Sequence, residues 1–282
     1  MVVLFLVAYV LDFGYSHVYS NTTKRNKVEN VINTQDKNLD VIMMGSSRAN
    51  NHFVAQLFVD KGFKAFNYGI SGSKLQETAL LLEIMIKNNY KIKSLLLEVD
   101  LNLNSDSFSF GNQAKFMPFI NSNAVVSEYY KDKLPDYASL AYIPFYRYIK
   151  YEPQIGFREF FFTLVQRKSN SLNNYGFYPL FNIGNNMNQD LLEKTPKKNA
   201  SYEQIKKLCI DNNIQLISIT TPVCENTRGI EYFTAIKEIY PEVINFENLV
   251  TEDQYFSSCG HLNDKGAMLF TAKIIAELNF KK

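Results

Sequence analysis

Ser47 is the first residue whose type and setting could support covalent chemistry. It ends the run Gly45-Ser46-Ser47, which follows a short apolar segment and precedes a helical pattern. A serine placed there exposes its hydroxyl at the start of a helix, where backbone N–H groups can stabilise the oxyanion of a tetrahedral intermediate. The alternative is that Ser46 or Ser47 only caps the helix, and the tripeptide by itself favours the cap.

A nucleophilic serine needs a base beside it, and the chain has three histidines. His17 lies in the N-terminal segment, and His52 falls within the helical pattern that follows Ser47. His261 stands in a loop directly before the last helical pattern, from which a side chain can reach back over the first strand of a parallel sheet. We therefore predict His261 as the base, with an ordinary loop or capping role as the alternative.

Strand-like and helical segments alternate in the first and last thirds of the chain. Apolar runs typical of buried strands cover residues 40–44, 64–68, 94–99, 215–220 and 243–245. Helical periodicity covers residues 48–61, 75–88, 202–212, 229–239 and 264–278. This alternation predicts an α/β fold with parallel βαβ units in one doubly wound sheet. Ligands of such a sheet bind at the carboxyl ends of the strands, which is where Ser47 lies.

Residues 103–198 match neither period and are rich in aromatic side chains, such as the run Phe160-Phe161-Phe162. We interpret this segment as a long aromatic-rich insertion packed over the sheet. It could be a second layer of hydrophobic core, or a lid or acceptor groove, because aromatic faces suit sugar rings and acyl chains. Both interpretations stay open from the sequence.

The N-terminal run Val2–Leu11 is almost entirely apolar but shorter than the roughly 20 residues that span a bilayer. It is either a membrane segment, complete only if further residues precede it, or a buried element of the domain. We expect residues 1–19 to form a transmembrane segment, 20–39 a polar linker, and 40–282 the domain. The domain then lies outside the cytoplasm, although the basic residues Lys24–Lys27 on that side run against the positive-inside tendency.

The composition and the motifs argue against several classes of binding protein. A net charge of +2 argues against nucleic acid as the main partner. The chain has three cysteines, none with the spacing of a zinc site, and we expect free thiols, although Cys224 and Cys259 could meet in three dimensions. No glycine-rich phosphate loop of the GxGxxG or GxxxxGK[ST] type is present, which disfavours a nucleotide- or flavin-binding domain of the same sheet type.

Taken together, three segments resemble the SGNH (GDSL-like) hydrolase superfamily. Residues 45–47 resemble its first block, with Ser47 as nucleophile, and residues 67–72 its second block, whose glycine donates an N–H to the oxyanion. Residues 261–267 resemble its final block, in which the catalytic histidine precedes the last helix. The resemblance covers about 40–104 and 200–279, and it implies a flavodoxin-like three-layer sandwich.

The resemblance also implies roles for individual residues. Ser47 and His261 would react, and the oxyanion would be held by the N–H groups of Ser47 and Gly72, with Gly69 as second choice to Gly72. The side chain of Asn102 would complete the oxyanion hole, although the family's Gly-x-Asn-Asp block is not evident after the third strand. The aspartate that usually stands three residues before the histidine is Ser258 here.

Two further polar residues have open roles at this stage. Asp100 could serve the site or merely cap a turn. Arg48 could bind an anionic acceptor, although a surface ion pair is the more usual role of an arginine.

The chain is most similar to membrane-anchored envelope members of the superfamily, such as DltD and the alginate O-acetylation proteins. This implies a serine esterase or O-acyltransferase acting on acyl groups, above all acetyl groups, of bacterial cell-surface polysaccharide. It would use an acylated glycan or acyl donor, work beside a membrane-bound acyltransferase, and need no metal or organic cofactor. The alternative is a non-catalytic scaffold of an envelope polysaccharide complex, which the missing aspartate and the long insertion motivate.

Overall fold

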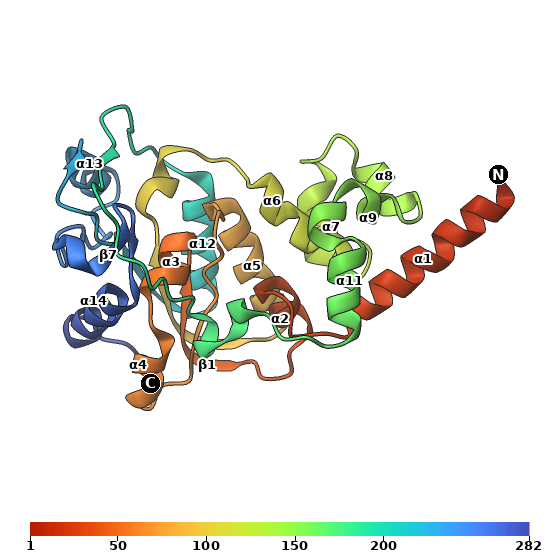
Figure 1. The fold of residues 1–282 in the computed structure, drawn as a ribbon, viewed down its shortest axis with the longest axis horizontal. Helices are drawn as coiled ribbons and strands as arrows, with labels where there is room; N and C mark the ends of the chain where they lie inside the picture. Colours follow the sequence, from red (N-terminus) through yellow and green to blue (C-terminus); the bar gives the residue numbers. More distant parts are fainter. Residues whose placement is uncertain (282) are drawn as a thin grey trace. The chain divides into compact units, whose positions relative to one another are not determined.

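A computed structural model of the chain describes residues 1–281, which divide into two compact units (Figure 1). Unit 1 combines Met1–Asp36, Leu80–Asn89 and Ser109–Leu172. Unit 2 combines Lys37–Ala79, Tyr90–Phe108 and the chain from Asn173 onward. The helix α5 (Leu75–Lys87) begins in unit 2 and continues into unit 1.

Unit 2 is built on a parallel four-stranded sheet of order β2-β1-β3-β5. Its strands are β1 (Asn38–Met44), β2 (Ala65–Asn67), β3 (Lys91–Glu98) and β5 (Gln215–Ile219). The predicted α/β fold with a mostly parallel sheet is therefore confirmed. Strands covered on both faces read as continuous apolar runs, which is why the sequence located them. The expected strand at 243–245 is wrong, because only a single bridge joins Ile244 to Ile219.

Helices and short two-stranded pairings complete unit 2. Its helices are α3 (Ser47–His52), α4 (Ala55–Asp60), α12 (Ala200–Asp211), α13 (Glu231–Ile239) and α14 (Asp264–Glu277), with the 3-10 turns η1 (Asp100–Asn104), η4 (Asn174–Gly176) and η5 (Asp253–Tyr255). The short strands β4 (Gln189–Asp190) and β6 (Thr227–Arg228) pair in parallel, and β7 (Phe256–Ser258) and β8 (His261–Leu262) pair antiparallel. One hydrophobic core joins β1, α3, α4 and α14.

The single helix predicted over 48–61 is wrong, because α3 ends at His52 and α4 starts at Ala55. Tertiary hydrogen bonds take over the backbone groups between the two helices. The Thr271 hydroxyl donates to the carbonyl of His52 and accepts the N–H of Val54. The Asn67 amide donates to the carbonyl of Phe53 at 2.8 Å. These partners lie on distant segments, so the local helical pattern could not reveal the break.

Unit 1 is a helical unit with an aromatic core. Its elements are α1 (Val2–Ser20), α2 (Lys27–Asn33), α6 (Phe110–Gln113), η2 (Ala114–Phe119), α7 (Ala124–Lys131), α8 (Tyr137–Tyr142), α9 (Tyr146–Lys150), α10 (Glu152–Ile155), α11 (Phe157–Leu164) and η3 (Asn170–Leu172). The ring of Tyr15 stacks on Phe160, with centroids 3.9 Å apart. Phe116, Tyr148 and Tyr151 are buried, so these aromatic residues of the segment 103–198 serve as core.

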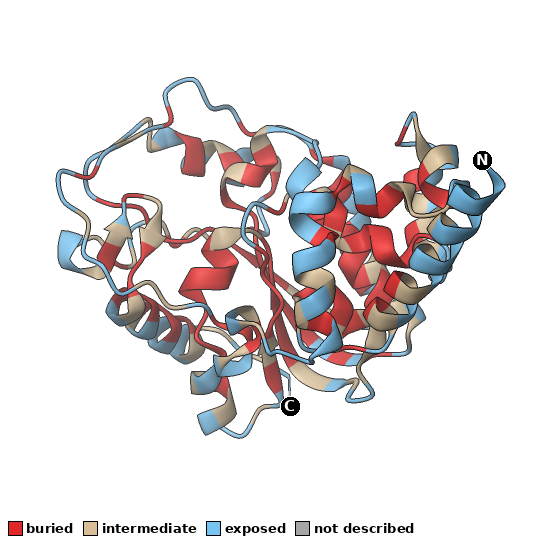
Figure 2. Cartoon of the chain, turned by 45° about the vertical axis from the view of Figure 1, so that its right-hand side comes forward, coloured by how far each residue is buried: buried red, intermediate tan, exposed pale blue. Residues whose placement is uncertain are grey.

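The helix α1 is the described helix whose length and composition suit a membrane span. It has 19 residues with a mean hydropathy of 1.6, and 11% of it is buried. Its N-terminal part is exposed (Figure 2). Tyr15 and Tyr19, in its second half, are buried. Such a helix is compatible with a membrane anchor or a signal sequence. The segment 20–39, read from sequence as a polar linker, contains the helix α2, in which Val28 and Val31 are buried.

The contacts of Asn67 with the segment that joins α3 to α4 can be tested by mutation. Its buried amide donates to the carbonyls of Ala49 and Phe53, and its oxygen accepts the N–H of Gly69. The Asn67→Ala variant should lose about 2–3 kcal/mol of unfolding free energy, because buried backbone groups lose their partners. Chemical denaturation followed by circular dichroism measures this, with the exposed Asn248→Ala as matched control. Equal stability of the two variants would contradict the assigned role of Asn67.

Candidate functional site

Ser46 and Ser47 lie just after the carboxyl end of β1, in the turn that leads into α3. Glu98, at the end of β3, contacts this turn. Ser46 is the N-cap residue, and its hydroxyl accepts the N–H of Arg48 at 3.2 Å. The capping role predicted for one of the two serines therefore belongs to Ser46, and Ser47 is the first residue of α3. Gly45 has a φ of 138°, and a Cβ there would lie 2.7 Å from Glu98 Oε2, so this position requires glycine.

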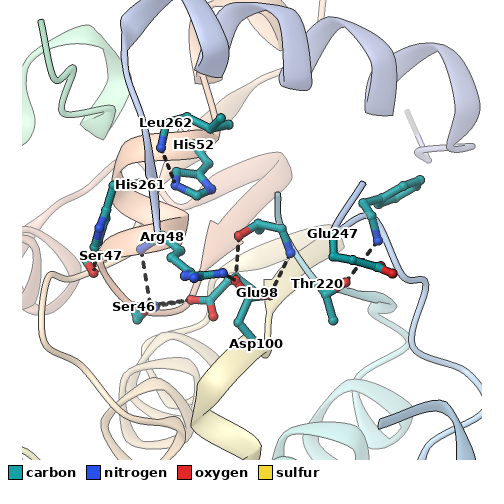
Figure 3. A network of polar contacts seen from close by, with 12 residues as sticks. Ser46, Ser47, Arg48, His52, Glu98, Asp100, Thr220, Glu247, His261 and Leu262 are labelled. Atoms are coloured by element: carbon teal, nitrogen blue, oxygen red, sulfur yellow. Dashed lines mark hydrogen bonds and ion pairs between the residues drawn. The ribbon is translucent and has the colours of Figure 1, made fainter. Parts of the chain in front are cut away.

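Ser47 and His261 are brought together from segments 214 residues apart. The distance from Ser47 Oγ to His261 Nε2 is 2.7 Å, which is hydrogen-bond distance (Figure 3). The other ring nitrogen, Nδ1, lies 3.2 Å from the hydroxyl of Ser258, which stands three residues before it in the chain. When the Ser47 hydroxyl donates to Nε2, the Nδ1 hydrogen points to Ser258.

His52 supports this arrangement without touching the serine. It is fully buried, and its Nε2 accepts the backbone N–H of Leu262 at 3.0 Å. Burial and the charge of Arg48 lower the pKa of His52 well below its usual range, so the ring is neutral. His52 thereby fixes the backbone of β8 one residue beyond His261, a contact that the sequence did not predict.

The electrostatic setting of His261 keeps its imidazole neutral. Burial, followed by the positive charge of Arg48, lowers its pKa to about 4. A neutral Nε2 can accept a proton from Ser47 at neutral pH. The imidazolium formed in that step has no carboxylate partner on Nδ1, so it is stabilised less than in a Ser-His-Asp triad.

A cavity of about 220 Å³ opens beside the serine and the histidine. It is lined by Ser46, Ser47, Arg48, Gly72, Ser73, Lys74, Glu98, Leu101, Asn102, Gln189, Gly260 and His261. Five of the residues singled out from the sequence, which are Ser47, Arg48, Gly72, Asn102 and His261, therefore line one pocket.

The two candidate oxyanion glycines differ in what holds them. The N–H of Gly69 donates to Asn67 Oδ1 at 2.9 Å, and a Cβ on Gly69 would collide with the backbone of Asn50. Gly69 is thus used for packing. Gly72 has a φ of 75° and lines the pocket. Gly69, the second choice made from the sequence, is not among the residues that line this pocket.

Arg48 forms an ion pair, but a buried one, so the surface pair expected from sequence is wrong. Its Nη1 lies 2.8 Å from Asp100 Oδ2, and the two side chains are 5% and 0% exposed. Asp100 also accepts the N–H and the hydroxyl of Thr221, from the segment after β5. The side chain of Asp100 is therefore the counter-ion of Arg48, and not a turn cap. A buried cation needs such a partner, because an unpaired charge away from solvent is strongly unfavourable.

Glu98, at the end of β3, is the site residue that sequence reasoning missed. It is fully buried and lines the pocket. Its Oε2 accepts the N–H of Ser46 at 2.7 Å and the Ser46 hydroxyl at 2.6 Å. Burial and the nearby Asp100 raise the pKa of Glu98 to about 7. The available signal was a carboxylate that directly follows the apolar run Leu95–Leu97 at the carboxyl end of the strand.

The expectation of free thiols is wrong for two of the three cysteines. Cys224 and Cys259 form a disulfide, and Cys209 is free and buried. The backbone N–H of Cys224 also donates to the carbonyl of Cys259 at 3.0 Å. The pairing depends on folding, which brings the segment after β5 to the turn between β7 and β8. Because Cys259 directly follows Ser258, the bridge fixes the loop that carries His261.

Among residues 1–281, no group of three or more His, Cys, Asp or Glu side chains is placed to hold a metal ion.

Comparison with known proteins adds little to this geometry. No protein-family model and no curated protein matches the chain. A solved structure from Streptococcus pneumonia, provisionally described as a platelet activating factor, matches 98% of this chain and 95% of its own chain. The identity is 15% and the TM-score 0.39, a level that carries no argument about function.

Ser258 offers a test of the histidine's electrostatics. In Ser258→Asp, a carboxylate beside Nδ1 should raise the pKa of His261 by about 1–2 units, because it stabilises the imidazolium. Since only neutral His261 accepts the proton of Ser47, the acid limb of Ser47 reactivity should move upward from about pH 4. The pH profile of Ser47 labelling by a fluorophosphonate measures this, with Ser258→Ala as matched control. An acid limb at the same pH in both variants would show that position 258 does not act on the imidazole.

Proposed function

We propose that the chain is a serine esterase or O-acyltransferase of the SGNH type, with Ser47 as nucleophile and His261 as general base. The single observation that carries the proposal is the 2.7 Å contact between Ser47 Oγ and His261 Nε2 at the edge of a lined pocket. An adjacent neutral base is the usual means of activating a serine hydroxyl.

The reaction would proceed in two balanced steps. Ser47 Oγ attacks the acyl carbonyl carbon while its proton passes to His261 Nε2. The oxyanion is held by the N–H groups of Ser47 and Gly72 and by the amide of Asn102. The tetrahedral intermediate collapses, the alcohol leaves with the proton from His261, and the acyl group remains on Ser47.

In the second step, the acyl group passes to an acceptor. Water or a sugar hydroxyl gives its proton to His261 and attacks the acyl carbon. The bond to Ser47 Oγ breaks, and His261 returns the proton to that oxygen. Water as acceptor gives hydrolysis, and a sugar hydroxyl gives transfer.

The sheet order favours this place for the site. Along the chain the strands run β1, β2, β3, β5, and their order in the sheet reverses between β1 and β3. In flavodoxin-like sheets, ligands bind at the carboxyl ends of the strands beside this reversal. Ser46 and Ser47 follow β1, and Glu98 ends β3, so the proposed nucleophile stands at that point.

The pocket favours a small, neutral acyl group such as acetyl. Its volume of about 220 Å³ is below the usual range for sites that enclose drug-sized ligands. Arg48 is already paired with Asp100 and buried, so Arg48 is a weak candidate for binding an anionic substrate. We infer an acyl ester on a surface polysaccharide as substrate, in keeping with the resemblance of the site segments to envelope SGNH proteins. A membrane-bound acyltransferase is the partner that this resemblance implies.

A location at the outer side of a membrane fits two features of the chain. The exposed apolar first half of α1 suits an anchor in the bilayer. The disulfide between Cys224 and Cys259 is typical of compartments outside the reducing cytoplasm. We therefore infer that α1 anchors the chain and that unit 2 lies outside the cytoplasm.

A scaffold without catalysis is the competing function, and Ser258 is the observation that favours it. With a hydroxyl in place of the usual carboxylate, the imidazolium is stabilised less. The two functions differ in whether Ser47 is activated: an esterase or acyltransferase needs a reactive Ser47, and a scaffold does not.

Fluorophosphonate labelling tests the activation of Ser47. The full chain in detergent should be labelled at Ser47, and peptide mapping by mass spectrometry should locate the adduct. Ser47→Ala should abolish labelling, and His261→Ala should slow it at least about a hundredfold, because the base is lost. Ser105→Ala, an exposed serine of unit 2, is the matched control and should react as the unaltered chain does. A folded chain that resists the probe would leave the scaffold as the better function.

Fractionation tests the inferred location. In a bacterial host, the chain should stay in the membrane pellet after alkaline carbonate extraction, and deletion of Val2–Leu11 should release it. Protease added to spheroplasts should digest unit 2, whereas it should spare a cytoplasmic marker. Digestion of unit 2 only after the spheroplasts are lysed would place it in the cytoplasm, against the inference.

A further inference from the structure

Glu98 is a buried carboxyl group in the pocket whose second oxygen is unused by the fold. We propose that Glu98 binds the substrate directly, by donating a hydrogen bond from its protonated carboxyl group to an oxygen of the acyl group that Ser47 attacks. This inference rests on the proposed function and adds a residue outside the expected set of Ser47, Gly72 and Asn102.

The two oxygens of Glu98 have different surroundings. Oε2 accepts both the N–H and the hydroxyl of Ser46. Oε1 is buried and has no hydrogen-bond partner among the described residues. Because Oε2 already accepts two hydrogen bonds, a proton on the carboxyl group belongs on Oε1. That O–H then lacks a protein acceptor, and a buried donor without a partner costs about 1–3 kcal/mol. A ligand oxygen in the pocket would supply the missing acceptor.

The charges around Glu98 explain why it can hold a proton. Asp100 is bonded to the only cation of this buried cluster, Arg48, and also to Thr221, so Asp100 is the carboxyl group that keeps the negative charge. A second ionised carboxyl group nearby would be buried and repelled. The other titratable groups that line the pocket or interact with Glu98 are Lys74, Tyr232 and His261.

The chemistry of acyl transfer favours the protonated form. Negative charge develops on the acyl oxygen in the transition state, and a hydrogen-bond donor in a dry site stabilises it. An ionised Glu98 in the same place would repel that charge. The ligand that fits is therefore a neutral acyl ester, and not a cation that a carboxylate would attract.

The sign of the pH dependence follows from the two groups. The reactive form has His261 neutral, which holds above about pH 4, and Glu98 protonated, which holds below about pH 7. Reactivity of Ser47 should therefore rise through the pKa of His261, stay level, and fall about tenfold per pH unit above the pKa of Glu98.

Glu98→Gln is the decisive variant. The glutamine oxygen can accept the two Ser46 donors, and its NH₂ group donates where the O–H stood, at every pH. The test is the second-order rate constant for fluorophosphonate labelling of Ser47, whose phosphoryl oxygen takes the place of the acyl oxygen. At about pH 6, Glu98→Gln should react within about threefold of the unaltered chain, and its rate should not fall above pH 7.

Two further variants complete the experiment. Glu98→Leu removes the donor and should slow labelling at least about tenfold at all pH values. Glu247→Gln changes a half-buried carboxyl group outside the pocket and should keep the alkaline fall of the unaltered chain. Thermal melting by circular dichroism identifies any variant that has lost its fold.

Each outcome decides between the possibilities. A folded Glu98→Gln that fails to react would mean that the ionised carboxylate is required, and a Gln variant that keeps the alkaline fall would mean that another group titrates. Either result overturns the inference while leaving Ser47 activated. If the unaltered chain is itself not labelled, the proposed function fails, and the inference fails with it.

Discussion

The site depends on two carboxyl groups, Glu98 and Asp100, which are buried at the end of β3 beside a single cation, Arg48. Arg48 comes from α3 and pairs with Asp100, which also binds Thr221 after β5. The interaction links the segments that follow β1, β3 and β5. It lies in the interior, where an unpaired charge would be strongly unfavourable. Glu98 is left without a cation and instead takes the two donors of Ser46, which fixes the turn that presents Ser47. Burial, followed by the charge of the same arginine, lowers the pKa of His261 and keeps its ring neutral.

The histidine is positioned by a different set of contacts. Its β8 backbone is held by His52, the β7–β8 turn is tied by the disulfide at Cys259, and the ring contacts Ser258. These restraints act on orientation. Orientation is one of the two tasks of the aspartate in a Ser-His-Asp triad, and charge stabilisation is the other. A hydroxyl can take over the first task and not the second, so the proposed reaction would be slower than with a carboxylate at this position.

The two halves of the helix α1 have different surroundings. The second half of α1 is part of unit 1, where Tyr15 and Tyr19 are buried and Asp12 pairs with the buried Arg147. The first half exposes apolar side chains that no described residue covers. A helix of this kind would hold unit 1 close to a bilayer, because its buried half cannot move independently of the unit.

The sequence by itself predicted most of the strands and helices, and it predicted the pair Ser47 and His261, whose side chains the structure brings into contact. Apolar runs such as 40–44 and 94–99 located the parallel strands, since strands buried on both faces leave a continuous local signal. Ser47 and His261 could be chosen because each stands at the end of such a pattern, and a serine nucleophile requires a base. Gly72 and Asn102 were predicted as oxyanion donors through resemblance alone.

Only the tertiary structure decided the contacts that join distant segments. The break between α3 and α4 depends on Thr271 and Asn67, the disulfide depends on the approach of Cys224 and Cys259, and the burial of Arg48 depends on Asp100. Glu98 went unnoticed because a single carboxylate at the end of a strand has no periodic signal. Its role depends on what surrounds it. Periodicity reports which face of an element is buried, whereas hydrogen bonds and charges depend on which groups meet after folding.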